Sequence, residues 1–267
     1  MPSHDVRSYF DERSTRYEKG NWQGGDLFPQ ELAAIESLPT GLRYAVDLGS
    51  GPGKPVSKLA TRARNVLAID SSARMLALRK HDSVTLVADG LHLPLRDHVI
   101  DAIYLRMSMH YFNVMQLKHE LHRIIKGAGV LLIVSIMPYG PEDENWFNER
   151  HKLKGKSGAY TPTIDSTVSQ FSPSFRLQSL TTWTVRNSVH TTIRSNHQGD
   201  KEALIQHAIS APLAIRDLYD IQPLQAGDIS MTVQWALLML TATEAADSTP
   251  TRKHETYAQN CPAESRN

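Results

Sequence analysis

Three acidic residues in the first third of the chain have the types and neighbours needed to bind a ligand. Asp47 precedes a glycine-rich turn at residues 49–53, while Asp70 and Asp89 each follow a later apolar run. Glycines let a backbone turn sharply and approach a ligand closely, and carboxylates accept hydrogen bonds from hydroxyl and amino groups. The pattern therefore predicts a binding site for a polar small molecule.

The spacing of the glycines narrows the kind of ligand. They stand at 49, 51 and 53, and Lys54 takes the position of the last glycine in the pattern G-x-G-x-x-G. That last glycine lets a helix and a strand pack closely around a pyrophosphate. Asp47, two places before the first glycine, instead suits a ligand with a positive group. The turn thus argues against a nicotinamide dehydrogenase, and a turn that only joins a strand to a helix remains open.

The elements that must position these carboxylates follow an alternating order. Strands are predicted at residues 43–48, 65–70, 83–88, 98–105 and 130–136, with helices between them at 54–64, 71–80 and 114–126. The segment Gly127-Ala128-Gly129 is predicted to end the last of these helices in a left-handed cap. Such alternation indicates a parallel sheet with helices on both faces. In such a sheet, ligands lie beyond the carboxyl ends of the strands, where the acidic residues stand.

This succession resembles the class I S-adenosylmethionine-dependent methyltransferases, in particular their small-molecule, type 11-like branch. The resemblance runs in order through residues 43 to 137. It rests on the following stretches: Ala45-Val46-Asp47-Leu48-Gly49-Ser50-Gly51, Asp70-Ser71-Ser72-Ala73-Arg74-Met75, Leu93-Pro94-Leu95-Arg96-Asp97 and Glu120 to Gly129. It implies an α/β fold with a Rossmann-like, seven-stranded, mostly parallel sheet, helices on both faces and a helical cap inserted around residues 138–229.

The resemblance also implies S-adenosylmethionine as the cofactor. It assigns the ribose hydroxyls to Asp70, the adenine to Asp89 and Leu91, and the methionine carboxylate to Tyr17 or Arg13 of a lead-in helix. Asp70 could also cap the helix that follows it. The cofactor-binding residues predicted in this way are Tyr17, Asp47, Gly49, Ser50, Gly51, Gly53, Asp70, Ser71, Met75, Asp89, Gly90, Leu91 and Arg106.

The acceptor is expected beyond the fourth strand. The residues predicted to border it are Met107, His110, Tyr111 and Trp146. His110 is the candidate general base, because the pKa of an ordinary histidine lies near neutral pH; a hydrogen bond to a neighbouring loop is the alternative role. No metal site is predicted, since His119 and His122 do not form the HExxH pattern.

Composition limits the other classes of protein. The chain has 267 residues, with 29 Lys and Arg against 28 Asp and Glu. This balance argues against a surface built to bind nucleic acid. The one cysteine, Cys261, excludes a disulfide framework and cysteine-based metal sites. The N-terminus carries no apolar signal sequence, and the apolar runs are shorter than the roughly 20 residues that span a membrane. We therefore expect a cytoplasmic enzyme that does not enter a membrane.

We expect four regions. Residues 1–40 form N-terminal helices that cover the cofactor, residues 41–137 form the S-adenosylmethionine-binding core, and residues 138–242 supply a cap, beginning with a loop or lid at 138–160, and the last strands. Residues 243–267 are polar and are expected to be disordered. The cap could supply an acceptor pocket or a contact in a homodimer.

The predicted function is methyl transfer to a small-molecule acceptor, whose accepting O, N or C atom stays open. One alternative is an enzyme that modifies tRNA or another RNA, for which a basic face would come from Arg62, Arg64, Arg74, Arg79 and Lys80. Another is a partner protein that binds the cofactor without catalysis, because binding and turnover are separable.

Overall fold

The computed structural model describes residues 4–17, 26–80, 83–155, 158–189 and 200–244. The strands of these segments form one sheet with the order β3-β2-β1-β4-β5-β8-β6, and the short β7 pairs with β8. The strands are β1 (Leu42–Leu48), β2 (Ala63–Asp70), β3 (Val84–Val87), β4 (Ile100–Arg106), β5 (Ile125–Ile136), β6 (Phe175–Ser188), β7 (Gln222–Pro223) and β8 (Ile229–Ala242).

The sheet confirms the predicted α/β class with one difference in strand number. Strands β1 to β5 run parallel, β8 runs antiparallel to β5, and β6 runs antiparallel to β8. The described residues contain eight strands instead of seven, because β7, of two residues, pairs with the start of β8. The chain passes outward from β1 to β3 and then returns to β4 on the other side of β1. This reversal leaves a crevice at the carboxyl ends of β1 and β4.

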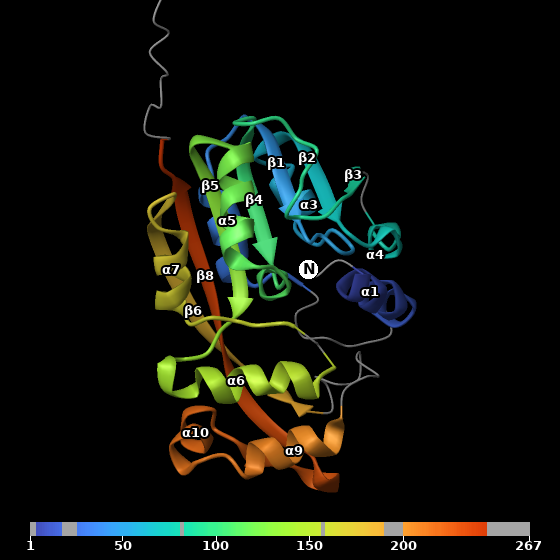
Figure 1. Cartoon of the computed structure of the whole chain (residues 1–267), viewed down its shortest axis with the longest axis vertical. Coiled ribbons are helices and arrows are strands. Elements are labelled where there is room, and N and C mark those ends of the chain that lie inside the picture. Colours follow the sequence, from blue (N-terminus) through green and yellow to red (C-terminus); the bar gives the residue numbers. More distant parts are fainter. Residues whose placement is uncertain (1–3, 18–25, 81–82, 156–157, 190–199, 245–267) are drawn as a thin grey trace, which may run out of the picture.

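Helices cover both faces of the sheet (Figure 1). Apolar side chains of α2 and α3 belong to the core on one face, and those of α5 and α7 belong to the core on the other. The helices described are α1 (His4–Tyr17), α2 (Pro29–Ser37), α3 (Val56–Leu59), α4 (Ala73–Ala77), α5 (Val114–Ile124), α6 (Pro141–Leu153), α7 (Ile164–Phe171), α9 (Lys201–Ile209) and α10 (Leu213–Leu218), with single 3-10 turns η1 (Met109–Tyr111) and η2 (Gln225–Gly227). None of them is long and apolar enough to cross a membrane.

The prediction of a loop or lid at 138–160 is wrong, because most of this segment forms the helix α6. The sequence of α6 has no strong apolar stripe, but its two ends carry residues that favour the start and the end of a helix. Pro141 opens the first turn, and the Asp143 carboxylate accepts hydrogen bonds from the backbone N–H groups of Tyr139 and Gly140. Acidic residues in the first turn and basic residues in the last turn complement the helix dipole.

The predicted cap is smaller than the segment 138–229, since α7 and β6 belong to the layers of the main sheet. The helices α6, α9 and α10 form the remaining lobe, which lies beyond the carboxyl ends of β4 and β5 (Figure 1). Phe147 of α6 and Leu204 of α9 are buried in one apolar cluster with Trp235 of β8. The predicted tail at 243–267 lies outside the described residues, except for its first two.

The predicted glycine cap after α5 is also wrong. The helix ends at Ile124, and Ile125 already pairs with Ile100 of β4 as the first residue of β5. The next pair is Ala102 with Val130, so the intervening residues bulge out of β5. Within this bulge the left-handed residue is Ala128, with φ 61°, and neither of the neighbouring glycines.

The bulge predicts different effects for its two glycines. A Cβ on Gly129 would lie 2.6 Å from Ile125 Cγ1 and 2.9 Å from the Lys126 carbonyl oxygen, whereas a Cβ on Gly127 would meet only Glu244 Cγ, at 3.3 Å. We expect Gly129→Ala to lower the free energy of unfolding by about 1–3 kcal/mol through overpacking, and Gly127→Ala to leave it nearly unchanged. Urea unfolding of both variants measures this, and equal effects would contradict the assignment.

Candidate functional site

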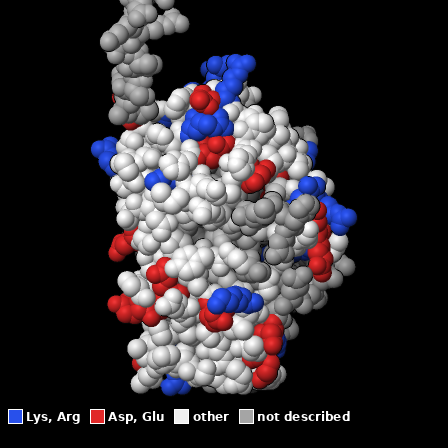
Figure 2. Space-filling model, viewed as in Figure 1, with Lys and Arg blue, Asp and Glu red and all other residues white. Residues whose placement is uncertain are grey.

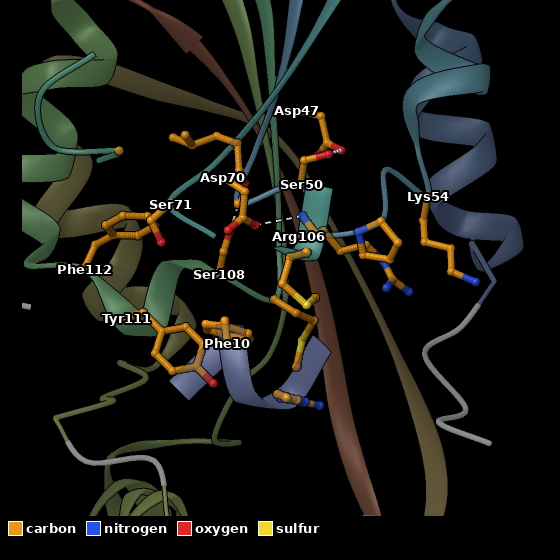
Figure 3. A pocket seen from close by; sticks show the side chains of 18 of the residues that line it. Phe10, Asp47, Ser50, Lys54, Asp70, Ser71, Arg106, Ser108, Tyr111 and Phe112 are labelled. Atoms are coloured by element: carbon orange, nitrogen blue, oxygen red, sulfur yellow. Dashed lines mark hydrogen bonds between the residues drawn. The ribbon is translucent and has the colours of Figure 1, made fainter. Parts of the chain in front are cut away.

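A cavity of about 440 Å³ lies at the carboxyl ends of the parallel strands. Figure 3 shows its side chains pointing inward from several elements. One wall comes from the glycine-rich turn and the ends of β2 and β3, and α1 covers it. The opposite wall comes from α6, β6 and β8. The volume of the cavity is typical of sites for small organic ligands.

The glycine-rich turn borders the cavity, and at Gly49 only a glycine fits. Gly49 has φ 68°, and a Cβ at this position would lie 2.5 Å from Ser108 Cβ. Ser108 in turn donates a hydrogen bond from Oγ to the Leu48 carbonyl oxygen at 3.1 Å. The turn after β1 is therefore held directly against Ser108, two residues after the end of β4.

Asp47 is a buried carboxyl group at the end of β1. Its side chain accepts a hydrogen bond from Ser50 Oγ at 2.6 Å, and the residue is 1% exposed. Burial raises the pKa of Asp47 to about 7, although the hydrogen bond from Ser50 opposes this rise. At neutral pH this carboxyl group is therefore poised to ionise when a positive group enters the cavity.

Asp70, at the end of β2, joins three elements of the site. Its two oxygens accept hydrogen bonds from the backbone N–H groups of Gly51 at 2.8 Å and Ser72 at 2.9 Å. Each carboxylate oxygen keeps a second lone pair for a ligand hydroxyl. Ser72, not Asp70, caps α4, because its Oγ accepts a hydrogen bond from the Met75 N–H. The same Oγ donates to Asp11 at 2.5 Å, which ties α1 to α4.

The region predicted to bind adenine is only partly exposed to the cavity. Asp89 and Gly90 line it, but Leu91 is buried in the core and does not. The Leu91 N–H already donates a hydrogen bond to Asp89 Oδ1 at 3.0 Å. Gly90 lies under the ring of Phe112, where a Cβ would approach the ring to 2.8 Å. Phe112, which the sequence pattern did not single out, thus forms an apolar wall beside Asp89.

Arg106 lies at the end of β4 and is fixed by a buried ion pair. Its Nε donates to Glu31 Oε1 of α2 at 2.6 Å, and its side chain is 8% exposed. Burial alone would lower the pKa of Arg106, but the hydrogen bonds and charge of Glu31 raise it. Arg106 is therefore a permanently charged residue in the cavity wall with a partner of its own.

Two of the residues predicted to touch the acceptor do not border the cavity. His110 is 2% exposed, and its ring stacks on that of His151 with centroids 5.1 Å apart. Its carbonyl oxygen accepts a hydrogen bond from the Tyr160 N–H, so its backbone anchors a neighbouring loop. Trp146 packs against the ring of His207, and its Nε1 donates to the His207 carbonyl oxygen at 3.3 Å. The structure therefore gives neither side chain access to a ligand in this cavity.

The other predicted residues are brought together. Those that line the cavity are Tyr17, Asp47, Gly49, Ser50, Gly51, Asp70, Ser71, Met75, Asp89, Gly90, Arg106, Met107 and Tyr111. Gly53 and Leu91 do not line it. Gly53 has φ 75° and turns the chain toward α3. Burial raises the pKa of Tyr111, whose ring packs edge-on against Phe10 of α1.

Several lining residues were missed. The main ones are Arg7 and Phe10 of α1, Lys54, Ser108, Phe112, Arg150 and Lys154 at the end of α6, and Asn187 of β6. Lys54 follows the glycine-rich turn, and the sequence pattern indicates only that it departs from the glycine of a pyrophosphate-binding turn. The α6 residues could not be found because their segment was predicted as a loop. Among the described residues, no group of three His, Cys, Asp or Glu side chains is placed to hold a metal ion.

Comparisons of the sequence with known proteins show similarity to methyltransferases. Residues 46–133 match the family described as "Methyltransferase domain". Uncharacterized methyltransferases of Mycobacterium tuberculosis and Mycobacterium bovis are 28% identical over 160 residues, which is 58% of this chain and 62% of each relative. The chain thus spans less than two thirds of the length of these relatives.

Solved structures show the same fold. The YcgJ protein from Bacillus subtilis superimposes with a TM-score of 0.73 at 21% identity, over 80% of this chain and 97% of that protein. A geranyl diphosphate C-methyltransferase from Streptomyces coelicolor, in complex with Mg2+, geranyl diphosphate and S-adenosyl-L-homocysteine, superimposes with a TM-score of 0.51 at 15% identity, over 80% of this chain and 79% of that protein. The resemblance to class I methyltransferases and the Rossmann-like fold are confirmed.

The buried carboxyl group of Asp47 predicts a pH-dependent stability. Its pKa is raised from 3.8 to about 7, so the folded protein without ligand binds more protons than the unfolded chain between these values. Stability from this group is therefore present at low pH and lost as pH rises toward 7. Relative to wild type, Asp47→Asn should gain about 2–3 kcal/mol between pH 5 and pH 8.

Urea unfolding at several pH values, with wild type and Asp47→Asn compared at each, isolates this residue from the other carboxylates. A constant difference between the two proteins across the range would show that Asp47 is ionised throughout.

Proposed function

We propose that this protein is a class I methyltransferase that transfers a methyl group from S-adenosylmethionine to a small-molecule acceptor enclosed by α1 and α6. One observation carries the proposal. The three acidic strand-end residues Asp47, Asp70 and Asp89 border a single cavity that continues to a separate wall made by other elements. One end can hold a cofactor while the other receives an acceptor.

The residues present fit this cofactor. Asp47 would receive its ammonium group, because a buried carboxyl group with a raised pKa is stabilised by an adjacent cation. Asp70 has lone pairs for both ribose hydroxyls, and Asp89 beside the Phe112 ring suits an adenine amino group and its flat face. The missing Cβ of Gly49 lets Ser108 pack against the turn, which keeps the turn in place at the border of the cavity.

When bound, S-adenosylmethionine supplies a methyl group made electrophilic by the positive sulfur. The chain's own contribution is to orient the acceptor and exclude water. Phe10, Tyr111 and Phe112 form apolar parts of the cavity lining, and Phe10 comes from the covering helix α1. His110 does not reach the cavity, so we assign it no role as a base. The chemistry we propose is therefore catalysis by positioning.

The enclosure favours a small acceptor over RNA. The cavity is covered by α1 on one side and bordered by α6 on the other. On the face seen in Figure 2, basic and acidic side chains are interspersed instead of forming one extended basic surface. Binding of RNA relies on clustered Lys and Arg residues. The Streptomyces coelicolor neighbour, which holds a small molecule and S-adenosyl-L-homocysteine together, supports the same proposal.

A labelling experiment tests the function. The protein is incubated with S-adenosylmethionine that carries a labelled methyl group, with a low-molecular-weight metabolite extract or with total tRNA. We expect label in a small product and none in tRNA. Label in tRNA would favour the RNA alternative. Tight cofactor binding without any labelled product from either mixture would favour a non-catalytic partner protein.

Asp70 provides a residue-level prediction. Asp70→Ala removes an acceptor of ribose hydrogen bonds at the carboxyl end of β2, and we expect it to weaken S-adenosyl-L-homocysteine binding by roughly 10- to 100-fold. Titration calorimetry measures this, with NAD as the ligand that should not bind comparably. Asp97→Ala, at an exposed carboxylate paired with Arg123, is the control that should leave the affinity unchanged. Unchanged cofactor affinity with a large loss of thermal stability would show that Asp70 is purely structural.

A further inference from the structure

Arg150, near the end of α6, is a buried cation in the cavity wall. The residue is 7% exposed and lines the cavity. Within the described part of the chain, no Asp or Glu oxygen lies within ion-pair distance of its guanidinium group, and its Nη1 is buried without a hydrogen-bond partner. Its guanidinium carbon lies 5.1 Å from the centre of the Phe147 ring and 5.7 Å from that of Trp146.

The acidic residue that acts on Arg150 from a distance is already engaged. Asp143 accepts hydrogen bonds from two backbone N–H groups and from the hydroxyl of Tyr219. It raises the pKa of Arg150 less than burial lowers it. An arginine stays protonated even so. Burying a cation without an ion-pair partner is costly, and within the described residues the contacts of the Arg150 guanidinium with the Phe147 and Trp146 rings supply no negative charge.

Among the described residues, carboxylates line only one side of the cavity. The acidic residues stand at the ends of β1 and β2 and just after β3, where the cofactor is proposed to lie. Four cations, Arg7, Arg13, Lys54 and Arg106, also line the cavity. Arg150 and Lys154 stand on the opposite wall, together with the amide of Asn187 on β6. That wall also includes Ile136 at the end of β5 and Val233 of β8. A ligand that spans the cavity therefore meets carboxylates at one end only, and at the other end, within the described part of the chain, it meets hydrogen-bond donors with no carboxylate among them.

From this arrangement we propose that the methyl acceptor carries an oxyanion, either a carboxylate or a phosphate, that binds Arg150, with Lys154 and Asn187 as further donors. A guanidinium group binds such anions through two parallel hydrogen bonds, and a site shielded from water strengthens them. This inference rests on the proposed function for the identity of the ligand at the acidic end. It goes beyond that function by naming the chemical class of the acceptor.

The stability of the protein without ligand provides the first test. Arg150→Met keeps an unbranched side chain against Phe147 and Trp146 but removes the charge. We expect this variant to be at least as resistant to urea as wild type. Lys152→Met, which removes an exposed charge from the same helix, is the matched control. A large loss of stability in Arg150→Met alone would show that Arg150 serves the helix end or the packing, and would overturn the proposal.

Anion binding provides the second test. Phenyl phosphate, benzoate and neutral benzyl alcohol are titrated by calorimetry into protein saturated with S-adenosyl-L-homocysteine. We expect at least one anion to bind about tenfold or more tightly than benzyl alcohol, and this preference to disappear in Arg150→Met, weaken in Arg150→Lys and persist in Lys152→Met. A stronger response to phenyl phosphate identifies a phosphate ester, and a stronger response to benzoate identifies a carboxylate.

Other outcomes separate this proposal from the proposed function. Equal affinity for the anions and benzyl alcohol in wild type would overturn the anionic acceptor and leave methyl transfer standing. A loss of S-adenosyl-L-homocysteine affinity in Arg150→Met would also overturn it, because Arg150 would then bind the cofactor. Failure of wild type to bind S-adenosyl-L-homocysteine would overturn the proposed function. The affinities for the anions and benzyl alcohol would then be compared in protein without S-adenosyl-L-homocysteine, and equal affinities would overturn the anion site as well.

Discussion

The buried carboxylate of Glu31 is the constraint on which the arrangement of the site depends. It is fully buried in α2 and accepts hydrogen bonds from the Tyr104 hydroxyl at 2.5 Å, from Arg106 Nε at 2.6 Å and from the Phe28 N–H at 2.9 Å. Breaking such a pair by removing one partner costs about 3–5 kcal/mol, because the other charge stays buried. Through this one group, α2 fixes the end of β4, which is the strand next to the topological reversal of the sheet.

Fixing the end of β4 also fixes the site. The chain leaves β4 through Met107, whose φ is 53°, and brings Ser108 against Gly49 so closely that no side chain fits between them. The turn at Gly49 is held to β2 by the hydrogen bond from Gly51 to Asp70, and Asp70 also accepts from Ser72, whose hydroxyl reaches Asp11 of α1. A continuous series of contacts thus runs from the core ion pair to the helix that covers the cavity.

The strands and the gathering of Asp47, Asp70 and Asp89 at one cavity could be predicted because their signals are local. Apolar runs such as Val66–Ile69 form buried strands, and the carboxyl ends of parallel strands share one edge, so Asp70 and Asp89 had to lie near the glycine turn. The conformation of the chain just beyond each strand was harder to predict. Leu91 was placed beside adenine, yet its N–H bonds to Asp89 two residues earlier, a turn that no periodic pattern reveals.

The position of α6 could not be predicted, for a different physical reason. Helix α6 has no strong apolar stripe, because it packs against α9 on one side and borders the cavity with charged residues of its last turn on the other. Its place depends on contacts with segments far along the chain, such as the hydrogen bond from Trp146 to His207. Strand ends fix the carboxylates in any sheet of this topology, whereas Arg150 owes its position to a lobe packed beyond it. The position of the carboxylates therefore depends on the topology of the sheet, and the position of Arg150 depends on the packing of the lobe that contains α6.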